Sequence, residues 1–271
     1  TTKASIYQLL KISCLGALLF FFACSDDDLQ AEASVELPDP VQDSIFITSI
    51  EIAENSPTNI TETYTLEYDA LLLTRILNET QNQPDAVFNF TYQNTRWTET
   101  EFISGGNLIF KDSLDYSDNN RIELLRSING QNAQQFFFNI DNFNRVSSIN
   151  VNLWNGSNFI NQENINLNFN ERQLMRIDRL NDQNLLQERI NFSNDVGNNP
   201  FIHHNQLQKI VYFLDFYAMG SNNALQITKQ NLSTGVITTI DQNITYNTDN
   251  FPIEIEVNEQ GSLSYIFYTY L

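Results

Sequence analysis

The stretch LEYDALLLTRIL, residues 66–77, contains the pattern on which the fold depends. Its apolar-x-aromatic unit ends at Tyr68, and three more units follow at intervals of 24 residues, ending at Tyr92, Tyr116 and Ile140. A polar cluster and a second apolar run follow most of these units, which is the pattern of two strands joined by a tight turn. Looser copies end at Phe169, Phe192, Tyr246 and Tyr270. The sequence therefore predicts a tandem array of hairpins with a repeat of about 24 residues.

The composition favours the same fold class. Asn, Thr, Ile, Phe and Tyr are abundant, and 41% of the 271 residues are hydrophobic, which is enough for the core of one all-β domain. Only 9 residues are Gly. We expect an all-β fold over residues 44–271, a curled antiparallel β-meander that twists towards a half-barrel. The positive φ angles of its tight turns are expected at Asn119, Asn120, Asn144, Asn170 and Asn250.

One segment has helical rather than strand spacing. Leu207, Ile210, Val211 and Leu214 follow one another at the i, i+3, i+4, i+7 spacing of a helix. The flanking Asn and Gly residues suit a helix start and a helix end. The sequence therefore predicts a short amphipathic helix near residues 205–219, with its apolar face packed on the sheet.

The first 23 residues have the features of an export signal. Two lysines precede an apolar run over residues 12–22, which is too short to span a bilayer. The motif Phe21-Phe22-Ala23-Cys24 resembles a bacterial lipobox, which implies acylation of Cys24, for example by palmitate, and removal of residues 1–23. An ordinary cleaved signal with an incidental cysteine, or an N-terminal membrane anchor, are the alternatives.

Acidic residues follow Cys24 directly. Ser25, Asp26, Asp27 and Asp28 resemble the export signal that sends lipoproteins of Bacteroidota to the cell surface. The alternative is that they only begin a solvated tether. Residues 24–43 contain two prolines and little apolar periodicity, which predicts a flexible acidic tether. The expected location is the outer membrane, with the lipoprotein exposed at the cell surface.

The charge excludes one class of partner. After the first 23 residues, which contain two Lys and no acidic residue, 12 basic and 33 acidic residues remain, a formal charge of −21. Such a surface repels phosphate backbones, so we expect no nucleic-acid partner.

Few catalytic chemistries are available. His203 and His204 are the only histidines, and no second cysteine remains beside Cys24 once the leader is removed, so we expect no metal site and no cofactor. Carboxylates are plentiful, and a glycosidase needs two of them across a cleft. Asp115 with Asp118 and Asp178 with Asp182 are candidate pairs, but turn-forming and solvated roles explain them equally well.

Aromatic residues suggest ligand binding instead. Trp97 and Trp154 could form a stacking platform for sugars, or they could be core residues and cross-strand pairs. Ser44 and Ser113 lie in Asp-Ser-apolar motifs that resemble the O-glycosylation acceptor of Bacteroidota.

The C-terminal stretch SLSYIFYTYL, residues 262–271, resembles the last strand of an outer-membrane barrel. Such a barrel needs a lipid-facing apolar band on every strand, whereas most strands here carry Asn or charged residues on one face. We therefore interpret this stretch as the closing strand of the sheet.

Together the tandem Y-D-x-x-x-R/L-x-x-I pattern, the lipobox and the NNPF motif at residues 198–201 resemble the YD-repeat-like surface lipoproteins of Bacteroidota, a family of unknown function. The resemblance covers about residues 64–271 and implies an extended antiparallel meander. The expected function is a non-catalytic binding or scaffold module of the outer membrane, with a glycan or an envelope protein as partner. A carbohydrate-active enzyme using paired carboxylates and a purely structural spacer are the alternatives.

Overall fold

The computed structural model describes residues 45–271 apart from 119, 144, 172 and 202–221. They form sixteen antiparallel strands. The strands are β1 (Ile47–Glu54), β2 (Ile60–Asp69), β3 (Leu72–Thr80), β4 (Ala86–Gln93), β5 (Arg96–Ser104), β6 (Asn107–Asp118), β7 (Arg121–Ile128), β8 (Gln131–Ile140), β9 (Val146–Trp154), β10 (Phe159–Asn170), β11 (Gln173–Asn181), β12 (Leu186–Asn198), β13 (Asn222–Asn231), β14 (Ile237–Tyr246), β15 (Pro252–Glu259) and β16 (Ser262–Tyr270).

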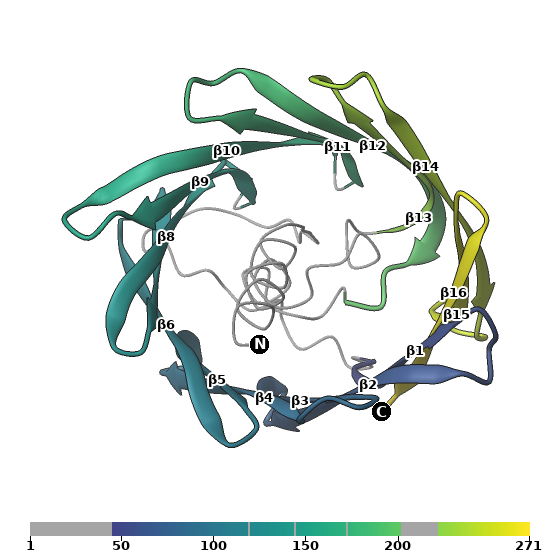
Figure 1. Cartoon of the computed structure of the whole chain (residues 1–271). Helices are drawn as coiled ribbons and strands as arrows, with labels where there is room; N and C mark the ends of the chain where they lie inside the picture. The colour runs from purple at the N-terminus through teal and green to yellow at the C-terminus, as the bar shows by residue number, and fades with distance from the viewer. Residues whose placement is uncertain (1–44, 119, 144, 172, 202–221) are drawn as a thin grey trace.

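The sheet closes on itself. Every strand pairs with its neighbours in the sequence, and β1 also pairs with β16, from Ile47–Tyr270 to Glu54–Ser264, so the strands form a closed barrel (Figure 1). The predicted all-β class is confirmed, but the open curled meander is wrong. β1 precedes the first tandem unit and pairs with the free edge of β16. Closure therefore removes both exposed sheet edges.

The predicted helix near 205–219 lies outside the described residues, as do the predicted signal segment and tether. The described residues contain no helix, and so none long and apolar enough to cross a membrane. The C-terminal stretch is confirmed as the closing strand, because β16 pairs with both β15 and β1.

The barrel has two ends. At the terminal end lie Ile47, Tyr270 and the turns that follow the even-numbered strands, whereas the turns that follow the odd-numbered strands lie at the far end. Hairpins that turn at the far end often share a short paired segment. β3 and β4, for example, are paired only from Arg75–Asn89 to Asn78–Ala86.

Tyrosines bridge these hairpins at the terminal end. The hydroxyl of Tyr92 on β4 donates to the carbonyl oxygen of Leu73 on β3 at 2.7 Å. Three other tyrosines bridge β1–β2, β5–β6 and β15–β16 in the same way: Tyr68 to Ile47 (2.7 Å), Tyr116 to Trp97 (2.8 Å) and Tyr270 to Pro252 (2.5 Å). The 24-residue interval is therefore the length of one hairpin unit, and its tyrosine binds the backbone of the preceding strand.

The turns only partly follow the prediction for asparagine. Asn250 has a φ of 64°, as expected, whereas the positive φ of the β10–β11 turn occurs at Glu171 (φ 51°). Asn119 and Asn144 lie outside the described residues. Other asparagines also occupy positive-φ positions: Asn55, Asn82, Asn94, Asn129 and Asn184.

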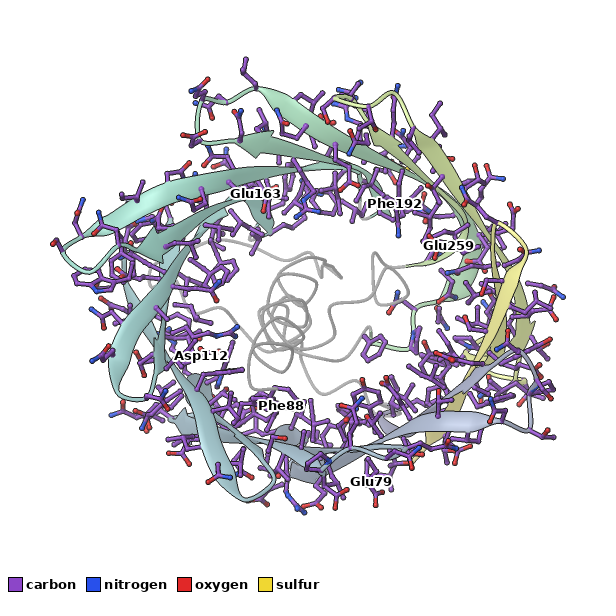
Figure 2. The ribbon with its side chains drawn as sticks, in the orientation of Figure 1. Glu79, Phe88, Asp112, Glu163, Phe192 and Glu259 are labelled. Atoms are coloured by element: carbon purple, nitrogen blue, oxygen red, sulfur yellow. The ribbon has the colours of Figure 1, made fainter. Side chains whose placement is uncertain are left out.

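The two faces of the wall differ in chemistry. On β10, Ile165 and Leu167 are buried, while Asn164 and Asn166, which alternate with them, lie on the opposite face. Figure 2 shows Phe88 and Phe192 on the inner side of the wall and Glu79 on the outer side. The apolar face of the sheet is therefore the inner face of the barrel.

Candidate functional site

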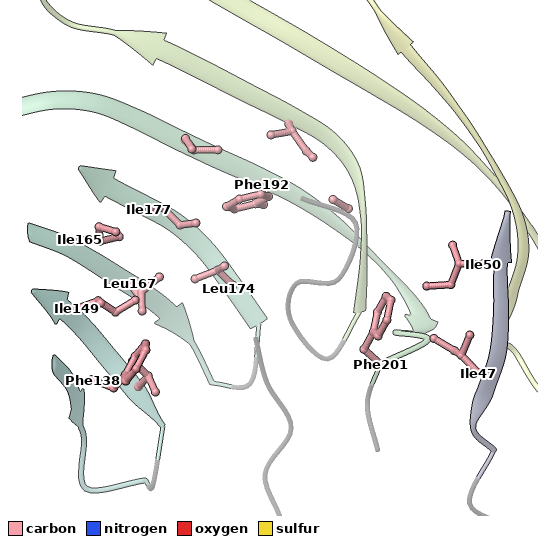
Figure 3. Close-up of a cluster of buried hydrophobic side chains, with 14 of the residues drawn as sticks. Ile47, Ile50, Phe138, Ile149, Ile165, Leu167, Leu174, Ile177, Phe192 and Phe201 are labelled. Atoms are coloured by element: carbon pink, nitrogen blue, oxygen red, sulfur yellow. The ribbon is translucent and has the colours of Figure 1, made fainter. Parts of the chain in front are cut away.

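The inner face carries a continuous apolar belt. Nearly every strand contributes buried side chains to one cluster, and Figure 3 shows part of it on β8–β12 and β1. Its fully buried members include Ile47, Leu124, Ile149, Ile165, Leu174 and Ile177. A barrel of about eight strands is already just wide enough to be filled by its own side chains, and this barrel has sixteen strands.

A buried ion pair lies at the edge of the belt. The Nε and Nη2 atoms of Arg126 on β7 donate to the two carboxylate oxygens of Asp112 on β6, each at 2.8 Å. Asp112 has no exposed surface, and the guanidinium stacks over Phe110, 3.9 Å from the ring centre. The bidentate geometry satisfies both charges, so the pair is compatible with its buried position.

A second charged cluster on the inner face lies towards the far end. Arg179 on β11 donates to Glu163 on β10 at 2.6 Å and to Glu188 on β12 at 3.0 Å. Burial lowers the pKa of Arg179, but the hydrogen bonds and charges of the two glutamates outweigh this effect and raise it. Lys229 and Glu259 lie 3.9 Å apart, also on the inner face. The inner face is thus apolar in its middle and charged towards the far end.

The outer face is joined by side-chain amides. Asn139 donates to Asn150 at 3.1 Å, and Asn150 donates to Asn164 at 2.7 Å. Asn164 in turn donates to Asn184 at 2.9 Å. This amide ladder crosses β8, β9 and β10 and reaches the turn after β11. Buried in hydrocarbon these polar groups would be costly, so the outer face has the chemistry of a solvated surface rather than a lipid-facing band.

The outer face also carries ion pairs between neighbouring strands. Asp178 on β11 accepts from Arg189 at 2.7 Å and lies 3.1 Å from Arg176. Glu67 and Arg75 pair across β2 and β3 at 2.6 Å.

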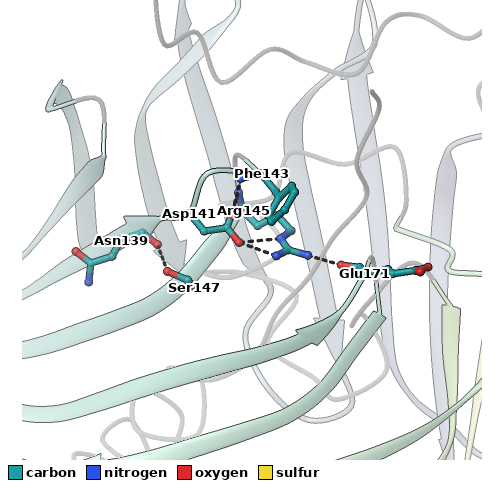
Figure 4. A network of polar contacts seen from close by, with 6 residues as sticks. All are labelled: Asn139, Asp141, Phe143, Arg145, Ser147 and Glu171. Carbon is teal, nitrogen blue, oxygen red and sulfur yellow. Dashed lines mark hydrogen bonds and ion pairs between the residues drawn. The ribbon is translucent and has the colours of Figure 1, made fainter. Parts of the chain in front are cut away.

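The turns at the terminal end of the barrel contain a compact polar network. Arg145, in the turn before β9, donates to Asp141 through Nε at 2.9 Å and through Nη2 at 2.7 Å (Figure 4). It also donates to the carbonyl oxygen of Glu171 in the next turn, and it stacks over Phe143 and Phe169, 4.8 Å from each ring centre. This arginine joins two neighbouring turns where no tyrosine bridge occurs, because the corresponding unit ends in Phe169.

The structure separates the two tryptophans. Trp97 is fully buried in the belt, and its indole N–H donates to Glu99 and Thr100. Trp154 lies on the outer face at the far end, with its ring centre 5.0 Å from that of Phe159. The two residues form no common platform, and Trp97 has the core position that was the alternative.

One of the other candidate positions lies on the barrel wall, and the rest lie outside the described residues. Ser113 is exposed on the outer face of β6. Ser44, Cys24, Ser25, Asp26, Asp27 and Asp28 lie outside the described residues, as do His203 and His204.

The candidate carboxylate pairs have local roles. Near the end of β6, Asp115 accepts a hydrogen bond from the backbone N–H of Ser117, and Asp118 accepts one from the backbone N–H of Asn120 in the following turn. Asp182 is exposed in the turn after β11, while Asp178 is ion-paired on the outer wall. Within the described part of the chain, no group of three or more His, Cys, Asp and Glu side chains could hold a metal ion.

Sequence reasoning missed the amide ladder and the inner charges. The alternation NINLNFN, residues 164–170, indicates asparagine on one face of a strand and apolar residues on the other. This signal was sufficient to place the asparagines of β10 on a polar face as well as in turns. No comparable signal pairs Arg126 with Asp112 or Arg179 with two glutamates, because these contacts depend on strand register.

No family model and no curated protein matches this chain. Two solved structures with similarity are porin-like proteins of Bacteroides. The protein from Bacteroides uniformis is 11% identical with a TM-score of 0.39, covering 83% of this chain and 96% of its own. The protein from Bacteroides vulgatus is 12% identical with a TM-score of 0.41, covering 84% and 99%. At these values the likeness assigns neither a family nor an activity to this chain.

Proposed function

We propose that this chain is a surface-displayed lipoprotein of the outer membrane that binds an apolar chain inside its barrel and catalyses no reaction. The observation that carries the proposal is the apolar belt on the inner face of a sixteen-stranded barrel. A membrane-spanning barrel has the reverse arrangement, with apolar side chains towards lipid and a polar interior. Anchoring through acylated Cys24, with Ser25–Asp28 as export signal, would place this binding module at the membrane.

The belt suits acyl or other hydrocarbon chains. Burial of apolar surface stabilises a complex by about 25 cal/mol per Å² before the costs of association are subtracted. The polar outer face, with its amide ladder and ion pairs, needs no lipid contact. A glycan or envelope-protein partner then fits best as the polar part of the bound molecule or as a neighbour on the outer face.

A fluorescent fatty acid tests the binding. The mature chain, residues 24–271 with Cys24→Ser, is prepared without detergent and titrated with cis-parinaric acid, whose emission rises in apolar surroundings. We expect saturable binding, displacement by other chain-bearing amphiphiles and no displacement by free maltose. A chain that needs detergent to stay monodisperse, or that gives no saturable signal, contradicts the proposal.

Two neighbouring residues provide matched variants. Ile227 lies on the inner face of β13 and is fully buried, whereas Thr228 lies on the outer face. We expect Ile227→Thr to weaken parinaric acid binding several-fold and Thr228→Ile to leave it unchanged. Circular dichroism checks that both variants keep the strand signal.

The anchor is tested separately. Mass spectrometry of the full-length chain expressed in a Bacteroidota host should show an acylated N-terminal Cys24 and loss of residues 1–23. An unmodified thiol on a chain with an intact leader would refute the anchoring without affecting the binding proposal.

A further inference from the structure

Gln242 is a polar side chain within the apolar belt. It lies between Ile240 and Ile244 on β14, opposite Val257 of β15, and it is 7% exposed. Neither its Nε2 nor its Oε1 has a hydrogen-bond partner. Because buried polar groups of folded proteins are nearly always paired, a buried amide with neither atom bonded marks a place suited to a polar group of a ligand.

The pairing of β13 with β14 ends next to Gln242. β13 and β14 are paired from Gln230–Ile237 to Gln226–Asp241, and Gln242 is the first residue of β14 beyond that segment. On the other side of β13, the pairing with β12 shifts register around Asn194. Gln242 therefore lies just beyond the point where the backbone pairing of β13 and β14 ends.

Two further acceptor atoms without partners lie on the adjoining strands. The Oδ1 of Asn223 on β13 and the Oδ2 of Asp195 on β12 are buried and unpaired. The orientation of the Asn223 amide is determined by its bonds, because its Nδ2 donates to the carbonyl oxygen of Asn198 at 3.0 Å. Burial raises the pKa of Asp195 although N–H groups of Asn223 and Gly197 donate to it.

Tyr246 lies on the same strand as Gln242 and contacts Asn223. Both residues belong to the inner face of β14, four residues apart, which is about 13 Å along a strand. The hydroxyl of Tyr246 accepts from Asn223 Nδ2 at 3.2 Å. Its ring packs on Gly197, where a Cβ atom would lie 2.5 Å from the ring, so only glycine permits this contact. Asp195 accepts from the backbone N–H of Asn223 at 3.1 Å, Asn223 contacts Tyr246, and Tyr246 shares the inner face of β14 with Gln242.

We propose that Gln242, Asn223 and Asp195 bind the polar head of an amphiphile whose hydrocarbon chain lies along the apolar belt. The unpaired atoms are three acceptor oxygens and one donor, the Nε2 of Gln242. A matching head must therefore supply mainly donors, as the hydroxyl groups of a sugar do. The ligand class is a glycolipid-like molecule, and this inference rests on the proposed binding of an apolar chain.

Two detergents with the same twelve-carbon chain test the head-group preference. Dodecyl maltoside carries many hydroxyl donors, whereas lauryldimethylamine N-oxide carries an acceptor and no donor at neutral pH. Each is used below its micelle concentration to displace cis-parinaric acid from the mature Cys24→Ser chain. We expect the unaltered site to prefer dodecyl maltoside by at least about 10-fold, the size of effect typical for one or two lost hydrogen bonds.

Variants on β14 identify the residue responsible. Gln242→Leu should abolish the preference while the ligand-free chain melts at a higher temperature, by about 2–4 °C, because an unpaired buried amide is removed. Gln242→Met, which is close to glutamine in length and volume, serves the same purpose where the Leu variant does not fold. Asn243→Leu, on the outer face of the same strand, is the control and should keep the preference.

The outcomes separate the two proposals. If neither detergent displaces the fatty acid because no fatty acid binds, the proposed function itself fails. If both detergents bind equally to the unaltered site, or if Gln242→Leu keeps the preference, the head-group site alone is overturned.

Discussion

Ile165 and Asn164 are neighbours on β10 and belong to different environments. Ile165 has no exposed surface and lies in the inner belt opposite Ile149, whereas Asn164 lies on the outer face and hydrogen-bonds with asparagines of neighbouring segments. Different interactions therefore stabilise the two faces of one wall. Inside, apolar area is removed from water, while outside, exposed amides exchange water for one another at little net gain.

The inner face also contains charges, and they should be the most sensitive positions. Asp112→Ala leaves Arg126 buried without its partner, so we expect a loss of about 3–5 kcal/mol in the free energy of unfolding. Urea denaturation followed by circular dichroism measures it. The double variant Asp112→Leu/Arg126→Met removes both charges and should lose much less, and a double variant as unstable as the single one would contradict this explanation.

The two neighbours on β10 provide a direct comparison of the faces. Ile165→Ala removes buried methyl groups from the belt and should lower the free energy of unfolding by about 2–5 kcal/mol. Asn164→Ala, its matched control, removes half-buried hydrogen bonds on the outer face and should lose about 1 kcal/mol or less. Equal losses at the two positions would show that the inner belt is not the dominant source of stability.

The tyrosine bridges at the terminal end should have a smaller effect at neutral pH than the buried charges and the apolar belt. Tyr116→Phe removes one hydrogen bond to Trp97 while keeping the ring, so we expect a loss of about 0.5–1.5 kcal/mol. Chemical denaturation at pH 7 measures it, and a loss as large as that of Ile165→Ala would make the bridges central to the fold.

The same bridges should also determine how the stability of the fold changes at alkaline pH. Burial raises the pKa values of Tyr68, Tyr116 and Tyr270 above their ordinary value of 10.0. The unfolded chain loses these protons first, so stability is full below pH 10 and falls as the pH rises beyond it. Replacing all three by Phe should flatten that fall, as measured by urea denaturation at several pH values from 9 upwards, within the range over which the chain stays folded.

The local sequence pattern was enough to predict most of the hairpins that form the barrel wall. The 24-residue units correspond to hairpins because each one places a tyrosine, a turn and two alternating strands in fixed order, as at Tyr68, Tyr92 and Tyr116. The polar face of most strands could also be read from the sequence, whereas the closure of the strands into a barrel could not. The two tryptophans show the limit, because an aromatic residue in a strand reads the same whether it faces the interior, as Trp97 does, or the outside, as Trp154 does.

The sequence by itself determined that this chain forms antiparallel hairpins with one apolar and one polar face, because side-chain alternation and turn chemistry act over a few residues. Only the tertiary structure decided that the sheet closes, that the apolar face lies inside and which charges meet. Pairing of β1 with β16 joins residues more than 200 positions apart. No local pattern specifies such a contact, since it depends on the twist summed over all the strands between them.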